Sequence, residues 1–242
     1  MERGLVLLVA ALVVYVTPSV QGTAHLSFSN DTVDITRTGC GVSKLCVESP
    51  EDCDPAGGSG CLFASVTATI PVAPNGTTLS IELRGESSGF IALGLTANVS
   101  QGTTLLFICG QNNLTNGSFF FRTRERINPD SASTANERIV TDIRGMVNGS
   151  VIKCEFNIPN VNATNIASRS SHATTAVIVL GNGTANGTDV GAFTIIRDSG
   201  PLNLADPASN VNGTAANNSG GAVQPHAVLL LLSVLSLLML RA

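Results

Sequence analysis

The chain alternates between short hydrophobic runs and polar turns from about residue 62 to residue 198. Runs such as "LSIEL" (79–83) and "VIKCEF" (151–156) place apolar residues at every second position, as half-buried strands do. No long helical pattern appears. The predicted strands are 62–72, 77–85, 89–95, 104–110, 118–124, 138–145, 150–158, 174–182 and 190–198. Many short strands with turns between them predict an all-β fold, an antiparallel β-sandwich of immunoglobulin-like, two-sheet architecture.

The first 22 residues have a different pattern. A charged start with Arg3 precedes an apolar run of 13 residues, Gly4 to Val16, and the small residues Val20 and Gly22 follow. This pattern is typical of a secretory signal peptide, and we expect cleavage after Gly22. The alternative, a transmembrane anchor, requires about 20 apolar residues.

The last residues form a second apolar run. Small residues at Asn218 and Ser219 precede a short spacer, the 14 apolar residues 227–240, and Arg241. This order predicts a GPI anchor attached at Ser219 or Asn218, with 220–242 removed as a propeptide. The alternative is a single membrane span, but 14 helical residues cover only about 21 Å of a hydrocarbon core of about 30 Å.

Six cysteines remain between these ends, namely Cys40, Cys46, Cys53, Cys61, Cys109 and Cys154. An even number in a secreted chain predicts disulfides, although six cysteines allow 15 pairings. The first four lie in a Pro/Gly/Asp-rich loop, 40–61, and the last two in strand-like runs. We therefore expect the first four to pair among themselves and Cys109 to pair with Cys154. Zinc ligands usually come in tighter pairs than these spacings, so no metal site is expected.

Acceptor sequons for N-glycosylation are frequent. They occur at Asn30, Asn75, Asn98, Asn113, Asn116, Asn148, Asn162, Asn182, Asn186, Asn212 and Asn217. A glycan is bulky and solvated, so each occupied position has to lie at the surface. Residues 203–219 lose the strand pattern, and we expect them to form a glycosylated stalk between a globular part, 23–202, and the membrane.

Composition and motifs indicate no enzyme. A net charge of −4 argues against nucleic-acid binding, which requires clustered positive charge. The segment "GGSG" (57–60) lacks the final glycine of a nucleophile elbow, and "GNGTANG" (181–187) has the character of a hairpin turn rather than a phosphate loop. The carboxylates Glu51 and Asp52 are expected to be solvated in the cysteine-rich loop.

Several stretches resemble the DOMON domain, specifically the extracellular module of ferric-chelate-reductase-like proteins. They are "GCGVSKLCVESPEDCDPAGGSGCLFASV", "LRGESSGFIALGLTANVSQGTTLLFICG" and "RIVTDIRGMVNGSVIKCEF", with a weaker match in "TTAVIVLGNGTANGTDVGAFTIIRDSGPL". The resemblance covers about residues 33–202. It implies a β-sandwich, which agrees with the strand pattern, and a family that binds haem or sugars or mediates protein interactions.

Haem-binding members of that family hold the iron between a methionine and a histidine. The methionine lies eight residues before the cysteine of a strand, which corresponds here to Gln101 before Cys109. The histidine lies four residues before a Pro-Leu pair, which corresponds to Arg197. Neither an amide nor a guanidinium replaces a thioether or an imidazole as a haem ligand. We therefore expect no haem and no other cofactor.

These observations favour a GPI-anchored glycoprotein on the extracellular face of the plasma membrane. Its DOMON module is expected to be non-catalytic and to bind a cell-surface protein or glycan. The alternative is a haem-binding electron-transfer module that uses other ligands, for which His172 and Met146 are the remaining candidates. Met146 is expected at a hairpin tip. A third hypothesis is a spacer without a ligand.

Overall fold

A computed structural model describes residues 25–57, 60–69, 77–161 and 175–210 of the 242-residue chain. Several expectations lie outside these residues. They are the signal peptide at 1–22, the GPI propeptide at 220–242 with its attachment site at Asn218 or Ser219, the candidate ligand His172, and the sequons at Asn75, Asn162, Asn212 and Asn217.

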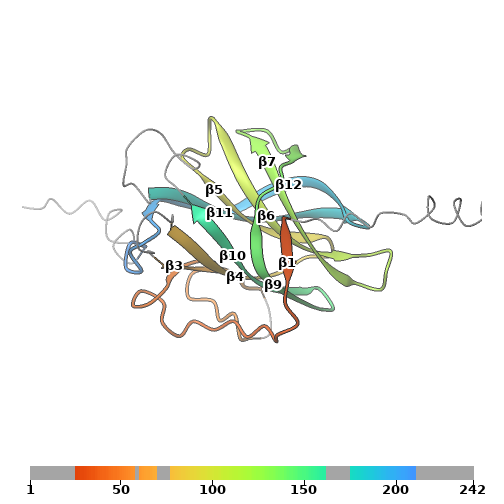
Figure 1. The fold of residues 1–242 in the computed structure, drawn as a ribbon, viewed down its shortest axis with the longest axis horizontal. Helices are drawn as coiled ribbons and strands as arrows, with labels where there is room; N and C mark the ends of the chain where they lie inside the picture. Colours follow the sequence, from red (N-terminus) through yellow and green to blue (C-terminus); the bar gives the residue numbers. More distant parts are fainter. Residues whose placement is uncertain (1–24, 58–59, 70–76, 162–174, 211–242) are drawn as a thin grey trace, which may run out of the picture.

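Two six-stranded sheets packed face to face form the described part, which confirms the predicted β-sandwich. They are visible as two layers in Figure 1. The first sheet has the order β1 (Leu26–Phe28), β9 (Val140–Asn148), β10 (Val151–Val161), β4 (Thr77–Glu86), β3 (Leu62–Thr69) and β2 (Leu45–Ser49). The second has the order β12 (Asp189–Asn203), β11 (Thr175–Asn186), β5 (Phe90–Thr96), β6 (Thr103–Asn112), β7 (Ser118–Ile127) and β8 (Ser133–Ala135).

All nine predicted strands correspond to strands of the structure, and three further strands were not predicted. β1 and β8 are three residues long, too short to show a periodic pattern, and β1 pairs with β9 in parallel. β2 lies inside the cysteine-rich loop, where the surrounding Pro, Gly and Asp residues hide the apolar triplet 45–47. Within the described residues there is no helix, so none that could cross a membrane.

The main core fills the space between the sheets. Along β10, alternate residues are buried, and Phe156 stacks on Phe107 at 5.6 Å and meets Phe121 edge-on at 4.9 Å between ring centroids. Burying each such ring contributes about 1.5–3 kcal/mol. The Cys109–Cys154 disulfide joins β6 to β10 within this core, so it links the two sheets directly.

The central strands of the second sheet are buried on both faces, whereas most of β12 at its edge is exposed or half-buried. All seven residues of β5 are buried, which explains why this run is apolar throughout. On the outer face, Phe193 of β12 packs against Phe90 and the neighbouring apolar side chains. Close approach is possible because β11 carries glycine there: a Cβ atom on Gly183 would lie 2.4 Å from the Phe90 ring. Asn186 pairs with Asp189, so the hairpin turn predicted for 181–187 lies instead at residues 187–188, because β11 continues through 181–186.

The cysteine-rich segment covers the outer face of the first sheet. Val33, Ile35 and Phe63 form a small apolar cluster there with the Cys40–Cys46 and Cys53–Cys61 disulfides beside it. Together with Cys109–Cys154, this is the grouping of cysteines that the sequence predicts. The Nζ atom of Lys44 lies 2.7 Å from Glu82, so the segment is also held by a largely buried ion pair.

The domain extends beyond the boundary predicted at residue 202. Leu204 is 3% exposed and belongs to the main core. The side-chain amide of Asn210 donates a hydrogen bond of 2.6 Å to the carbonyl of Cys46. Residues 203–210 are therefore part of the sandwich and not of a stalk, because Leu202 and Leu204 continue the alternation of β12 past its predicted end.

Candidate functional site

Gln101, the position of the expected methionine, lies in the exposed loop between β5 and β6. The loop backbone is held by Asn128, whose amide donates to the carbonyl of Asn98 at 2.6 Å and to that of Gln101 at 3.3 Å. The hydroxyl of Thr96 donates across the loop to the carbonyl of Thr103 at 2.8 Å. The loop conformation is therefore fixed by buried polar groups that do not involve the Gln101 side chain.

Asn128 belongs to a buried polar cluster that the sequence did not reveal. Its Oδ1 accepts from Thr104 at 2.7 Å and from Arg126 at 3.0 Å. The Arg126 guanidinium lies 5.6 Å from the centre of the Phe193 ring. Desolvation lowers the pKa of Arg126, and the charge of Asp130 partly opposes this effect. The cluster closes one end of the outer apolar face, and no motif in the sequence marks it.

Arg197, the position of the expected histidine, lies on β12 after a bulge. Leu180 pairs with Arg197, but Gly181 pairs with Ile195, so Ile196 is the extra residue of β12. Paired residues share one face of a sheet. Since Leu180 faces the main core, the bulge turns Arg197 to the inner side, towards the cysteine-rich segment.

The Arg197 side chain lies in a polar groove between β12 and the cysteine-rich segment. The groove has a volume of about 600 Å³. Nη2 of Arg197 is 3.7 Å from Glu51, and Arg37 contacts Glu48 at 2.8 Å and Asp52 at 3.1 Å. The remaining lining includes Cys40, Cys46, Asp198, Ser199, Pro207 and Asn210. Glu51 and Asp52 are exposed as expected, yet each contacts an arginine of this groove.

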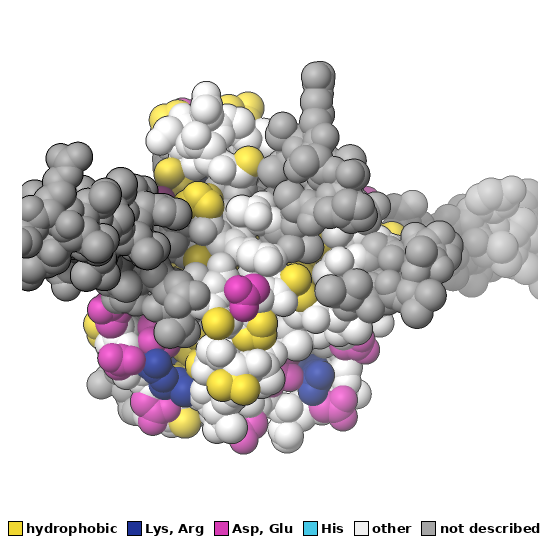
Figure 2. Space-filling view, turned by 90° about the vertical axis from the view of Figure 1, so that its left-hand side faces the viewer, with side chains coloured by type: hydrophobic (Ala, Val, Ile, Leu, Met, Phe, Trp, Pro, Cys, Tyr) yellow, Lys and Arg dark blue, Asp and Glu magenta, His cyan; other side chains and the backbone are white. Residues whose placement is uncertain are grey.

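Figure 2 looks onto the left-hand end of Figure 1, where the C-terminal end of the described chain, coloured blue in Figure 1, lies. Acidic and basic side chains lie next to one another on the lower part of this face. Side chains of both charges can donate to and accept from the hydroxyl, amide and charged groups of a ligand. The groove is therefore suited to a polar partner.

Met146 is not at a hairpin tip. It lies within β9, opposite Lys153 on β10, and is 42% exposed. The turn between these strands comes later, at Gly149. The hairpin prediction for "RGMVNG" is correct in kind but displaced by three residues, because the strand continues through the sequon at Asn148.

The sequon asparagines of the described part are all accessible. Asn30, Asn98, Asn113, Asn116, Asn148 and Asn186 are exposed, and Asn182 is half-buried. Asn148 and Asn186 are the last residues of β9 and β11, and Asn182 lies within β11, between Ile91 of β5 and Thr194 of β12. In the part of the chain that the structure describes, no three His, Cys, Asp or Glu side chains are grouped so as to hold a metal ion.

The chain is similar in sequence to ferric-chelate reductase 1 proteins. It is 28% identical to one from Danio rerio over 199 residues, which is 81% of this chain and 32% of that protein. It is 25% identical to the Homo sapiens protein over 171 residues, or 70% of this chain and 26% of that protein. The chain thus spans less than a third of the length of these relatives. Comparisons with protein-family models and with solved structures find no match.

The residues at the two expected ligand positions do not fit a haem. Gln101 and Arg197 offer neither thioether nor imidazole. The bulge at Ile196 turns Arg197 to the inner side of the sheet, whereas the cluster that holds the Gln101 loop lies on the outer side. Phe193, Phe90 and Leu106 fill the outer face. The arrangement therefore offers no iron-binding pair at these positions.

Proposed function

We propose that the protein is an extracellular, GPI-anchored glycoprotein whose DOMON-like sandwich carries no haem and binds a cell-surface protein or glycan. The observation that carries this proposal is the setting of Arg197. Where related modules would need an imidazole, this chain has a guanidinium that contacts Glu51 in a polar groove. Arg197 therefore contributes to a charged surface and does not provide a ligand for a haem iron.

Four described sequons lie away from the groove. Asn113, Asn116, Asn148 and Asn186 lie at or beside the turns of three hairpins, which project at the right-hand end of Figure 1. The groove is lined by residues 197–200 in the second half of β12, whereas the β11–β12 turn precedes the first half of that strand. Glycans at the hairpin turns would therefore hinder a partner there and not at the groove, although the sequon at Asn98, in the loop before β6, lies at the other end of that strand from Asn113.

The similarity to ferric-chelate reductases raises a second candidate, a redox module. Since the chain spans only about a third of the Danio rerio protein, the reductase activity in that name is a property of a longer chain. Met146 is exposed on β9, and the other candidate ligand, His172, lies outside the described residues. The described histidine, His25, contacts β9 at that strand's first residue, where the His25 backbone carbonyl accepts a hydrogen bond from Val140. A redox function is therefore less well supported than partner binding.

Absorption spectroscopy separates the two functions. The chain has no Trp, and its one Tyr, Tyr15, lies in the expected signal peptide, so bound haem would dominate the spectrum. We expect no Soret band in protein purified from a haem-replete secretory host, because Gln101 and Arg197 supply no suitable ligand.

Variants of the two positions provide the comparison. Gln101→Met with Arg197→His restores both ligand types, but the bulge and the filled outer face should still prevent stoichiometric haem binding. Gln101→Met with Ile196→His is the matched control on the neighbouring position of β12. A Soret band in the unmodified protein that disappears in Met146→Leu would favour the redox module and contradict the proposal.

A further inference from the structure

A second hollow lies between the two sheets, apart from the polar groove. Its walls come from the end of β5, the start of β6 and the end of β10, and its volume is about 340 Å³. This is at the small end of the range of about 300–1,000 Å³ that is typical of ligand pockets. The hollow is therefore large enough for one small ligand or a single chain.

The walls of this inter-sheet pocket that β5, β6 and the buried part of β10 form are apolar and continuous with the core, whereas Glu137, Arg138 and Asn160 add polar groups to the remaining lining. Leu95 and Phe107 are each 2% exposed, and Ile158 is 7% exposed. Leu105 and Val161 pack against the same cluster from the rim. Phe107 is held in place at the bottom of the pocket because its ring stacks on that of Phe156, with 5.6 Å between the ring centroids. Such walls give a ligand's hydrocarbon portion an apolar environment.

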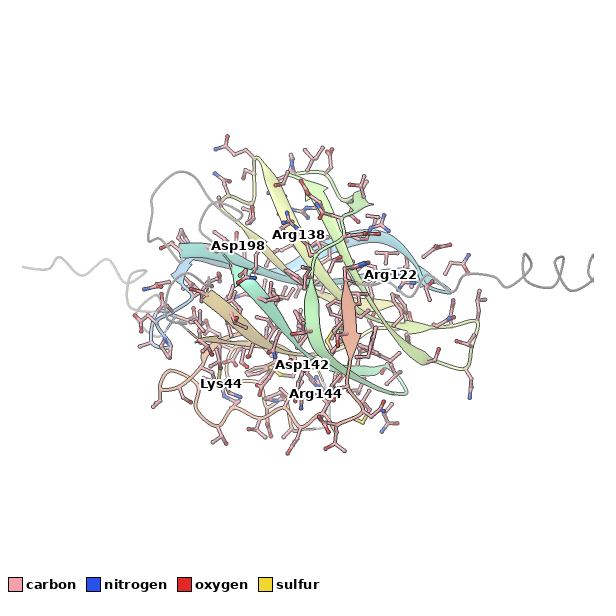
Figure 3. All side chains as sticks on the ribbon, viewed as in Figure 1. Lys44, Arg122, Arg138, Asp142, Arg144 and Asp198 are labelled. Atoms are coloured by element: carbon pink, nitrogen blue, oxygen red, sulfur yellow. A yellow bond between two sulfur atoms is a disulfide. The ribbon has the colours of Figure 1, made fainter. Side chains whose placement is uncertain are left out.

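The mouth of the pocket carries one arginine and one exposed isoleucine just before β9. The Nε atom of Arg138 is buried and has no hydrogen-bond partner among the described residues. Glu137, also at the mouth, is 81% exposed and lies 3.8 Å from His25. Ile139 is 65% exposed although it is apolar. Figure 3 shows Arg138 beside the start of β9.

We propose that the inter-sheet pocket binds a free fatty acid, with the acyl chain between the sheets and the carboxylate on Arg138. A guanidinium forms two parallel hydrogen bonds with a carboxylate, and this pairing would use the unsatisfied donor of Arg138. The exposed Ile139 extends the apolar wall along the entering chain. A volume of about 340 Å³ suits one acyl chain rather than the two chains of a diacyl phospholipid. This site is separate from the polar groove and does not depend on the anchor.

Fluorescence of cis-parinaric acid tests the proposal on the glycosylated mature protein. This probe brightens in apolar surroundings, and the chain lacks tryptophan fluorescence that would interfere. We expect a saturable increase with one site per chain, which palmitate reverses. Hexadecanol has the same chain length without the carboxylate, and it should compete at least about tenfold less well, as expected for the loss of a charged hydrogen bond.

Two variants locate the site, and each has a matched control. Arg138→Gln should weaken parinarate binding at least about tenfold, because the charged donor is lost. Ile139→Glu should weaken it as well, because it places a like charge at the mouth, and both positions tolerate polar side chains. Lys153→Gln and Val42→Glu change charge elsewhere, the latter at a side chain that is 83% exposed, and should bind as the unmodified protein does.

Three results would overturn the assignment. The first is a correctly folded protein that does not bind parinarate. The second is equal binding by the Arg138 and Ile139 variants, or equal competition by hexadecanol. The third is displacement by phosphatidylcholine vesicles that contain no free fatty acid, which would make the occupant a membrane lipid. None of these results bears on the absence of haem or on partner binding at the groove.

Discussion

Glu155 shows how single residues of this domain respond to pH. Its side chain is 15% exposed on β10, beside Arg144 at 3.2 Å. Burial raises the pKa of Glu155 above its ordinary 4.5; Glu82 and Asp34 add to the rise, whereas Arg144 and a backbone hydrogen bond from Asp34 oppose it. The folded state thus binds this proton more tightly than the unfolded state. As the pH falls from neutral towards 4.5, Glu155 should therefore cost less stability.

Glu155→Gln should raise the free energy of unfolding at pH 7, by less than about 1 kcal/mol, since only one ion pair changes. At about pH 3.5, where Glu155 is mostly protonated in both the folded and the unfolded state, the variant and the unmodified protein should converge. Urea unfolding at both pH values measures the difference. Glu137→Gln, at a side chain that is 81% exposed, should change neither value. A Glu155→Gln variant that is less stable at pH 7 would show that the Arg144 ion pair outweighs burial.

The sequence alone identified the two positions at which the family resemblance places haem ligands, because each position is defined by its spacing along the chain. Counting from Cys109 and Pro201 located Gln101 and Arg197, and chemistry excluded both as haem ligands. The sequence could not predict which face of the sheet the Arg197 side chain occupies. That face depends on a one-residue bulge at Ile196, which no local sequence pattern indicates. The Asn128 cluster was missed for a similar reason: its members become neighbours only when β5, β6 and β7 pair.

At the scale of elements, the three disulfides are expected to contribute unequally. Cys109–Cys154 closes a separation of 45 residues, whereas Cys53–Cys61 closes a separation of 8. The chain-entropy account assigns about 4 kcal/mol to the former and about 2.5 kcal/mol to the latter. Both cysteines of the longer pair are fully buried, so their replacement also disturbs the core.

Cys109→Ala with Cys154→Ala should therefore lower the free energy of unfolding, and the secreted yield, more than Cys53→Ala with Cys61→Ala. Thermal unfolding of the secreted proteins and their yields give the comparison. Equal losses in the two double variants would mean that the inter-sheet bond adds nothing to the core around it.

The strands themselves were largely predictable because most of them are half-buried. β4 and β10 bury every second residue over most of their length, so their alternation appears directly in the sequence. β5 is buried on both faces, and its continuous apolar run also predicts a strand. The short strands β1 and β8 depend on pairing with β9 and β7, which no local signal provides.

At the scale of the whole molecule, the sandwich ends close to the expected anchor site. Asn210 is held to Cys46, and the predicted attachment at Asn218 or Ser219 follows within nine residues. We expect a phosphatidylinositol-specific phospholipase to release the protein from cells. Release into the medium, measured by immunoblotting, is the readout. Retention after treatment, together with survival of a tag placed after Arg241, would show that the chain is held by its own hydrophobic segment.

The edges of the two sheets restrict how another chain can attach. The edge strands β1 and β8 are only three residues long. On the edge strand β2, the backbone carbonyl of Cys46 already accepts a hydrogen bond from the side chain of Asn210. β12 is a long edge of 15 residues, but its register breaks at three places. A partner therefore finds little straight, unpaired backbone on which to add a strand. A partner of this domain would therefore be bound mainly through side chains, and edge-to-edge growth into fibrils is disfavoured by the same geometry.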